Sequence, residues 1–400
     1  MLTLLGYTLI GGSVAYSAVP LFEEVFMRKR VAKKELIKKL GKTFRDGSLF
    51  KKVEDYEVYP ALLRSEIKED KITIVFTVPK GLEPDEFAKK EYVFKQYFGK
   101  YIDLNIDISR VVLQIYPKGL PKKLVYKYDS VIGSTEGFKL PIVCGQGLEG
   151  NMYTFDMVKH PHILISGETG SGKSSEIRSI LATLIMLKKP NELRLILGDL
   201  KRSEFHLYKQ IEHVESVSHS ADELRPQLKK VKKEMTKRGS QLDKEGVNSI
   251  DELKQKLPYI VVCIDEVALL RKETDIMDIM EEISSIGRSL GVFIILSMQR
   301  PDAKLLDGKL KVNLTVRMGF MTADSINSKI IGTPGSENIT NVGRTLLKVN
   351  SSVQEIQCPW LDNKKAEKLL QPFKVKKEDK PVQSEEDEHS KVLELFNDES

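Results

Sequence analysis

The segment that most constrains this chain is the run GETGSGKSS at Gly167–Ser175, which fits the pattern G-x-x-x-x-G-K-[ST]. In that pattern, glycines permit a tight turn that points backbone N–H groups and a helix N-terminus at phosphate groups. The apolar stretch His162–Ser166 comes before the run and the amphipathic stretch Glu176–Leu187 follows it, which predicts a strand, a loop and a helix. We therefore expect a phosphate-binding loop for a nucleoside triphosphate, with a chance glycine-rich turn as the alternative.

The loop pattern assigns parts to its residues. Lys173 is expected to reach the β- and γ-phosphates of ATP, and Ser174 is expected to ligate Mg²⁺. The other expected nucleotide-binding residues of the loop are Gly167, Glu168, Thr169, Gly170, Ser171, Gly172 and Ser175.

An acidic element to hold the metal ion is expected in a second buried strand. Within LPYIVVCIDEVALL, at Leu257–Leu270, the apolar strand Ile260–Ile264 runs directly into Asp265 and Glu266. We expect Asp265 to hold Mg²⁺ through water and Glu266 to polarise the water that attacks the γ-phosphate. An N-capping aspartate would explain Asp265 alone, but not an Asp-Glu pair after five apolar residues.

Two further apolar runs, Leu193–Leu197 and Val292–Leu296, predict two more strands. Their alternation with helical segments predicts an α/β fold with a parallel sheet. Gln299 closely follows the second run and is expected to sense the γ-phosphate, because open α/β sheets bind ligands at the carboxyl ends of their strands. A simply solvated glutamine is the alternative.

From about Leu140 to Val349 the sequence resembles the FtsK/SpoIIIE family of DNA translocases, within the HerA/FtsK group of hexameric motors. Three blocks carry the resemblance: HPHILISGETGSGKS, LPYIVVCIDEVALL and SSIGRSLGVFIILSMQRPDAKLLDGKLKVNLTVRMGF. The last block is the most selective, since many ATPases share a phosphate loop. The resemblance implies a RecA-like P-loop NTPase fold, ATP hydrolysis coupled to DNA translocation, and a homo-oligomer, expected to be a hexamer.

The resemblance also implies roles that spacing alone does not. Arg288 matches the arginine finger that reaches a neighbouring subunit's ATP site, whereas its own position indicates only a cation favourable at a helix C-terminus. Lys309 and Lys311 match a loop that faces the central pore. The segment Arg238–Asn248, with Lys244, matches the other pore loop, so these three lysines are the expected DNA-binding residues. Solvated surface lysines are the alternative.

The amino-terminal stretch Leu2–Phe22 contains no charged residue, and a cluster of lysines and arginines follows it. About twenty apolar residues can cross a bilayer, and the positive-inside rule puts the basic cluster in the cytoplasm. We therefore expect a single-pass anchor in the cell membrane with the motor in the cytoplasm. A cleaved signal peptide and a surface helix are the alternatives.

Five regions are expected along the chain. The small domain between anchor and motor is predicted from strand Lys71–Val78, helix Pro84–Phe98 and strands Ile102–Ile106 and Val111–Tyr116. After Phe373 the composition is too charged to build a core. The regions are a transmembrane anchor (1–24), a basic juxtamembrane segment (25–60), a small α+β domain (61–135), an FtsK-like ATPase motor (136–373) and an acidic tail expected to be disordered (374–400).

Composition sets only outer limits on function. The net charge of +6 is compatible with a DNA partner without demanding one, and the three cysteines stand too far apart for a metal site. One expected span and a compact motor are similar to the coupling proteins of Gram-positive conjugative elements, which implies a relaxase or relaxosome and a type IV secretion channel as partners. A chromosome or cell-division translocase and an FtsK-like ATPase of a protein secretion system are the alternatives.

Overall fold

The structure is a computed structural model that describes residues 31, 33–303, 306 and 308–375. The predicted anchor Leu2–Phe22 lies outside these residues, as does the acidic tail from residue 376 onward. Within the described ranges, no helix combines the length and the apolar character that crossing a membrane requires. The chain divides into two compact units, the smaller one containing residues up to Leu124 and the larger one most of the remainder.

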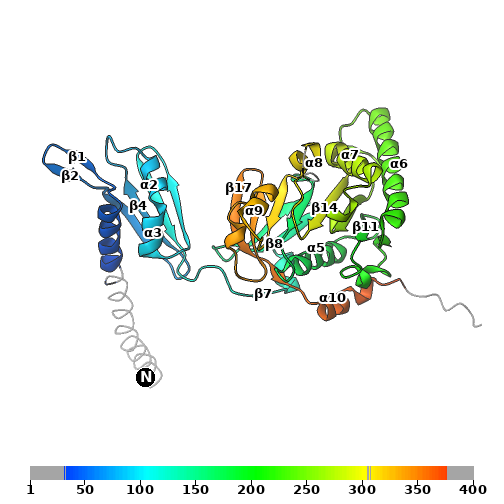
Figure 1. The fold of residues 1–400 in the computed structure, drawn as a ribbon, viewed down its shortest axis with the longest axis horizontal. Coiled ribbons are helices and arrows are strands. Elements are labelled where there is room, and N and C mark those ends of the chain that lie inside the picture. The colour runs from blue at the N-terminus through cyan, green and yellow to red at the C-terminus, as the bar shows by residue number, and fades with distance from the viewer. Residues whose placement is uncertain (1–30, 32, 304–305, 307, 376–400) are drawn as a thin grey trace, which may run out of the picture. The chain divides into compact units, whose positions relative to one another are not determined.

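The smaller unit is built on an antiparallel sheet with the strand order β3-β4-β6-β5 (Figure 1). The strands predicted around residues 71–78, 102–106 and 111–116 are confirmed as β4, β5 and β6. The predicted helix Pro84–Phe98 is two helices that meet at Lys90. The elements of this unit are a helix over residues 33–46, β1 (Lys51–Val53), β2 (Tyr56–Val58), β3 (Leu62–Ile67), β4 (Ile72–Thr77), α2 (Asp85–Lys89), α3 (Glu91–Phe98), β5 (Ile102–Ile106) and β6 (Arg110–Ile115).

A cluster of phenylalanines fills the core of the smaller unit. The ring of Phe76 on β4 lies 4.9 Å from that of Phe44, 5.7 Å from that of Phe87 and 6.2 Å from that of Phe94. Phe44 comes from the helix over residues 33–46, which also buries Leu36 and Leu40 in the same core. The segment expected to be a basic juxtamembrane stretch therefore includes a helix that packs on the small sheet.

The larger unit contains most of a ten-stranded sheet in the order β12-β11-β13-β14-β10-β15-β16-β17-β8-β9. The strands from β12 to β15 pair in parallel, as predicted, and β16 turns antiparallel to β15. The strands are β8 (Pro141–Gln146), β9 (Met152–Asp156), β10 (Ile163–Ser166), β11 (Leu193–Asp199), β12 (Val214–Ser218), β13 (Tyr259–Asp265), β14 (Val292–Met298), β15 (Val316–Gly319), β16 (Arg344–Val349) and β17 (Ser352–Gln357).

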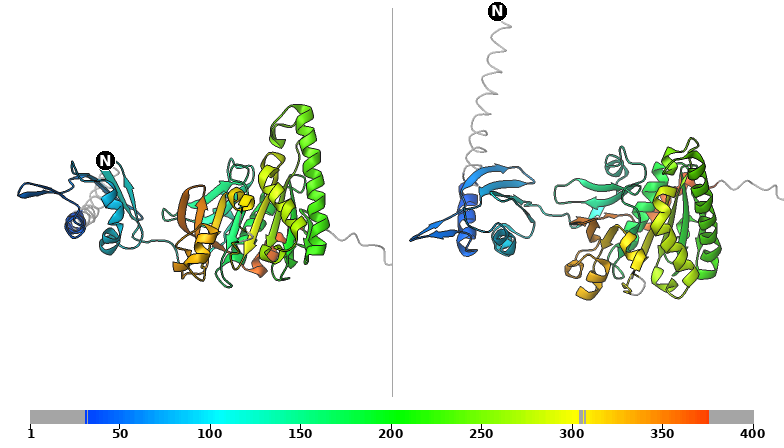
Figure 2. Two further views of the ribbon diagram at one scale, coloured as in Figure 1. Left: turned by 45° about the horizontal axis from the view of Figure 1, so that its top comes forward. Right: turned by 90° about the horizontal axis from the view of Figure 1, so that it is seen from above.

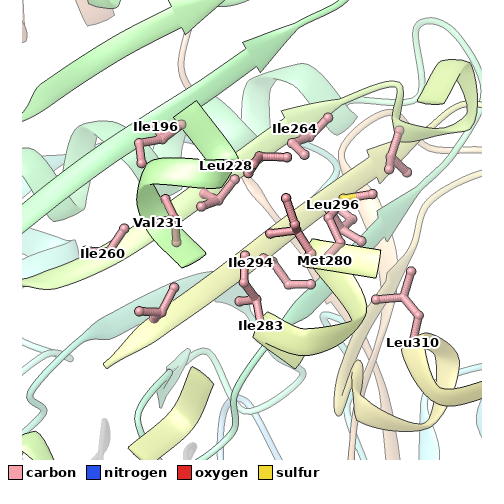
Figure 3. Packing of buried hydrophobic residues seen from close by; sticks show 14 of the residues in the cluster. Ile196, Leu228, Val231, Ile260, Ile264, Met280, Ile283, Ile294, Leu296 and Leu310 are labelled. Atoms are coloured by element: carbon pink, nitrogen blue, oxygen red, sulfur yellow. The ribbon is translucent and has the colours of Figure 1, made fainter. Parts of the chain in front are cut away.

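Helices α6 and α7 lie side by side on one face of this sheet (Figure 2). Leu228 and Val231 of α6 and Ile283 of α7 pack onto the sheet residues Ile264 and Ile294 (Figure 3). The remaining elements are β7 (Leu124–Val125), α4 (Tyr128–Ile132), α5 (Lys173–Leu187), η1 (His206–Tyr208), α6 (Ala221–Glu245), η2 (Ile250–Glu252), η3 (Val267–Leu270), α7 (Thr274–Leu290), α8 (Gly308–Asn313), α9 (Ser325–Ile331), η4 (Ser336–Asn338), β18 (Pro359–Trp360), α10 (Asn363–Leu370) and η5 (Gln371–Phe373).

Candidate nucleotide site

The strand register brings the predicted functional segments to one edge of the sheet. Asp199 at the end of β11 pairs in register with Asp265 at the end of β13. Ser166 at the end of β10 pairs with Met298 at the end of β14. Since these strands are parallel, their carboxyl ends share one edge, which is where α/β sheets bind ligands.

The phosphate loop joins β10 to α5, and two of its glycines, Gly167 and Gly172, stand where a side chain would not fit. Gly172 is the N-cap of α5 with φ of 106°, and a Cβ there would lie 2.6 Å from the backbone nitrogen of Gly343. A Cβ on Gly167 would lie 2.5 Å from the Cβ of Phe320. Gly343 donates its N–H to the carbonyl of Ser171 at 2.8 Å, so a distant segment supports the loop from outside.

Lys173, the first residue of α5, is buried among acceptors from two neighbouring strands. Its Nζ donates to Oδ1 of Asp265 at 2.8 Å and to Oγ of Ser297 at 2.7 Å. The Ser297 hydroxyl in turn donates to the same Asp265 oxygen at 2.6 Å. The structure therefore brings together the predicted Lys173 and Asp265, and it adds Ser297, which the sequence did not single out. The partners compensate the cost of burying both charges.

Glu266 directly follows β13, and its backbone is left-handed with φ of 57°. One carboxylate oxygen accepts the backbone N–H of Gln299 at 3.2 Å, and the other accepts Nζ of Lys201 at 2.7 Å. Gln299 directly follows β14 at the carboxyl end expected from the sequence, and its backbone lies beside Glu266. Sequence reasoning missed Lys201, although its place just after β11 was a signal, since that strand ends at the same sheet edge.

The described residues fit a magnesium ion held mainly by phosphate and water. Ser174 is half-buried in the first turn of α5, next to Lys173, whose Nζ contacts Asp265. Within the described part of the chain, no three His, Cys, Asp or Glu side chains gather that could hold a metal by themselves. Magnesium in nucleotide sites needs only one or two protein ligands, because phosphate oxygens and water supply the others.

The remaining predicted site residues lie on other elements. Arg288, in the last turn of α7, is exposed and donates through Nε to the carbonyl of Val158 at 3.1 Å. It lines a surface hollow together with Lys139 and Lys159. The residues that line this hollow include none of the phosphate loop.

The segments expected to be pore loops are helical. α6 extends to Glu245, so Arg238 is a buried helix residue and the exposed Lys244 stands in the last turn. Lys309 and Lys311 belong to the short helix α8. The first of these segments is therefore helical up to Glu245, because the apolar spacing that anchors α6 continues through Met235 and Leu242.

Fold and site together define an ATPase domain with a phosphate loop on a parallel sheet. Residues 124–256 match the model of the FtsK/SpoIIIE family, which confirms the predicted resemblance. The DNA translocase FtsK of Borreliella burgdorferi is 32% identical over 257 residues, which are 59% of this chain and 32% of that protein. The chain thus spans about a third of the length of this relative.

Two solved structures share the fold. The pCW3 conjugation coupling protein TcpA, in its monomer form with ATPγS, aligns with a TM-score of 0.58 and 24% identity, over 79% of this chain and 94% of that one. EssC, ATPases 2 and 3, from Geobacillus thermodenitrificans aligns with a TM-score of 0.56 and 20% identity, over 64% of this chain and 51% of that one. These similarities confirm the α/β P-loop fold.

Proposed function

We propose that this chain hydrolyses ATP with Mg²⁺ and couples the hydrolysis to DNA translocation. The observation that carries the proposal is the buried cluster of Lys173, Asp265 and Ser297 at the strand ends, with Glu266 beside it. Lys173 would exchange its contact with Asp265 for the β- and γ-phosphates, and Glu266 would orient the attacking water and take up its proton.

The described residues would hold the metal ion at two points. Ser174 would bind Mg²⁺ directly and Asp265 would hold it through water. Held by these residues, the ion would offset the negative charge that develops on the phosphate oxygens. Gln299, whose backbone N–H contacts Glu266, would report the presence of the γ-phosphate through that contact. Arg288 would act on the site of a neighbouring subunit in a homo-oligomer, which we propose is a hexamer.

We further propose that the chain is a membrane-anchored coupling protein for conjugative transfer of a mobile element. In support, the fold aligns with 94% of the solved conjugation coupling protein TcpA. Leu2–Phe22 would be the anchor, with the motor in the cytoplasm. DNA, a relaxase or relaxosome and the proteins of a type IV secretion channel would be its partners.

The motor activity is tested on purified protein beginning at Val31, which keeps the helix over residues 33–46 that packs on the small sheet. ATP hydrolysis should require Mg²⁺ and should rise when double-stranded or single-stranded DNA is added. Replacing Lys244, Lys309 and Lys311 together by Ala should weaken the stimulation by DNA and leave hydrolysis without DNA unchanged. Hydrolysis that no DNA stimulates would contradict the translocase proposal and favour a role such as protein secretion.

The cellular role is tested by deleting the gene and, separately, only the segment Leu2–Phe22. Both deletions should abolish transfer of the mobile element while growth and chromosome partition stay normal. The purified protein without the segment should keep its ATPase activity, and the intact protein should stay in membranes through carbonate washing, because hydrocarbon burial does not depend on ionic attraction. A defect in chromosome partition with normal transfer would identify a chromosome translocase instead. The disappearance of a protein from the culture medium would identify a secretion ATPase.

A further inference from the structure

The carboxylate expected to activate water is held by a lysine to which the sequence assigned no part. Nζ of Lys201 lies 2.7 Å from Oε2 of Glu266. The side chain of Glu266 is only 7% exposed, whereas that of Lys201 is 35% exposed. Oε1 of the same carboxylate accepts the backbone N–H of Gln299. Both oxygens of Glu266 therefore already have hydrogen-bond donors.

The turn that carries Lys201 is held in place by Asp199 at the end of β11. The carboxylate of Asp199 accepts the backbone N–H groups of Ser203, Glu204 and Phe205 at distances of 3.0, 3.1 and 2.9 Å. This turn is therefore pinned to the end of β11, and β11 pairs directly with β13, the strand that leads into Glu266.

The same turn is tied to the helix that follows the phosphate loop. Glu204 accepts Nη2 of Arg178 at 3.2 Å, and Arg178 lies on α5 one turn beyond Lys173 and Ser174. Nη1 of Arg178 donates to the carbonyl of Leu361 at 2.7 Å, which holds the guanidinium in place. The contact between Arg178 and Glu204 thus links α5 to the turn that carries Lys201.

An ammonium group at this distance opposes the chemistry expected of Glu266. A charge-assisted hydrogen bond from lysine takes up one acceptor position on Oε2, so an attacking water has fewer acceptor positions on this carboxylate and competes there with a cation. Because Lys201 is partly exposed, its Nζ can exchange the carboxylate for water. The buried carboxylate of Glu266 loses its ionic partner in that exchange and keeps the backbone donor from Gln299, so the bound nucleotide and the attacking water have to offset the lost contact.

We propose that Lys201 is a positioning residue that restrains Glu266 and so keeps ATP hydrolysis slow when no DNA is engaged. The inference rests on the proposed function, since it assumes that Glu266 activates water. It predicts that removing the ammonium raises hydrolysis without DNA and reduces the factor by which DNA stimulates hydrolysis.

The experiment compares the wild type with Lys201→Met, Lys201→Arg and the control Lys209→Met. Lys209 is exposed and eight residues further along, so the control removes the same charge with the same substitution. The steady-state kcat and KM for ATP are measured without DNA and with saturating double-stranded DNA. Melting temperature and affinity for a fluorescent ATP analogue establish that each variant is folded, and Lys201→Gln replaces Lys201→Met if the latter does not fold.

The expected result is a kcat without DNA about ten-fold higher in Lys201→Met, roughly the rate equivalent of one charge-assisted hydrogen bond, with unchanged KM. The kcat with DNA should stay at the wild-type value, so that the stimulation factor falls. Lys201→Arg and Lys209→Met should behave as the wild type.

A folded Lys201→Met protein whose DNA-free kcat is equal to or below that of the wild type would overturn the inference, since a lower value means that Lys201 supports the base. Failure of the proposed function gives a different result: the wild type does not hydrolyse ATP, or Glu266→Gln hydrolyses it as fast as the wild type.

Discussion

The two units of this chain bury different kinds of side chain. The core of the smaller unit is a phenylalanine cluster, and its ion pairs, such as Lys118 with Glu69, lie at the surface. The larger unit places Lys173, Asp265 and Glu266 out of contact with water at one edge of its sheet. Apolar burial stabilises a fold without special geometry, whereas a buried ion pair contributes little net stability. The buried charges of the larger unit are therefore best explained by its chemistry.

Arg238 is a buried charge that lies away from the carboxyl ends of the strands, and its contacts are purely structural. Arg238 of α6 is 1% exposed and donates to the carbonyls of Leu290 at 2.8 Å and Pro258 at 2.9 Å. It therefore fastens α6 to the end of α7, which carries Arg288, and to the residue before β13. Two of its nitrogens serve fixed carbonyls, and its Nε donates to Glu234 of the same helix at 3.0 Å. The ammonium of Lys173, in contrast, can exchange a carboxylate for phosphate.

The largest expected effect concerns Arg288, and it tests whether the larger unit needs a second copy of itself. Arg288→Ala should lower the rate of ATP hydrolysis by about 10³- to 10⁵-fold, the usual contribution of an arginine finger, while melting temperature stays unchanged. Mixing Arg288→Ala with Lys173→Ala should restore part of the activity, because a mixed interface can combine an intact finger with an intact phosphate loop. If mixed rings form and remain inactive, Arg288 does not act as a finger.

A smaller effect, on stability and not on rate, is expected in the smaller unit. Phe76→Ala removes the ring at the centre of the phenylalanine cluster and should destabilise this unit by about 3 to 5 kcal/mol. Chemical denaturation followed by circular dichroism measures the loss. Tyr92→Ala on the same unit, where the side chain is 55% exposed, is the control and should change little. If Phe76→Ala lost ATP binding, the smaller unit would also be needed for the nucleotide site, and the proposed difference between the two units would be wrong.

The smallest expected effect is an acid sensitivity of the larger unit. Burial lowers the pKa of His162 to about 4, and its Nδ1 accepts the backbone N–H of Ile294 at 3.2 Å. Since the unfolded side chain has a pKa near 6.5, the unfolded state binds the proton first as pH falls. Stability should be constant above about pH 6.5 and should fall by about 3 kcal/mol in total between there and about pH 4.

His162→Asn keeps an acceptor for Ile294 and does not titrate in this range, and asparagine tolerates the left-handed backbone at this position, where φ is 63°. The variant should therefore lose this part of the pH dependence in denaturation experiments. An unchanged pH profile would assign the acid sensitivity to other groups.

Motifs with a fixed local geometry could be predicted from the sequence, and contacts between distant segments could not. The loop at Gly167–Ser175 and the pair Asp265 and Glu266 follow apolar strands, so their place at one sheet edge followed from the parallel topology. The contacts of Ser297 with Lys173 and of Gly343 with Ser171 could not be predicted from neighbouring residues, because they depend on which strands lie side by side in the sheet. The helix over residues 33–46 had a signal in the four-residue spacing of Leu36, Leu40 and Phe44, which its dense lysines obscured.

The central claim is that Glu266 activates water at a site built by Lys173 and Asp265, and one measurement tests it most directly. Glu266→Gln protein is loaded with radiolabelled ATP and Mg²⁺, and bound ATP and ADP are quantified over time beside the wild type and Lys173→Ala. Glu266→Gln should bind ATP with wild-type affinity and retain it unhydrolysed, because only the proton acceptor has been removed, while Lys173→Ala should bind little ATP. Conversion of bound ATP to ADP by Glu266→Gln at the wild-type rate would contradict the claim.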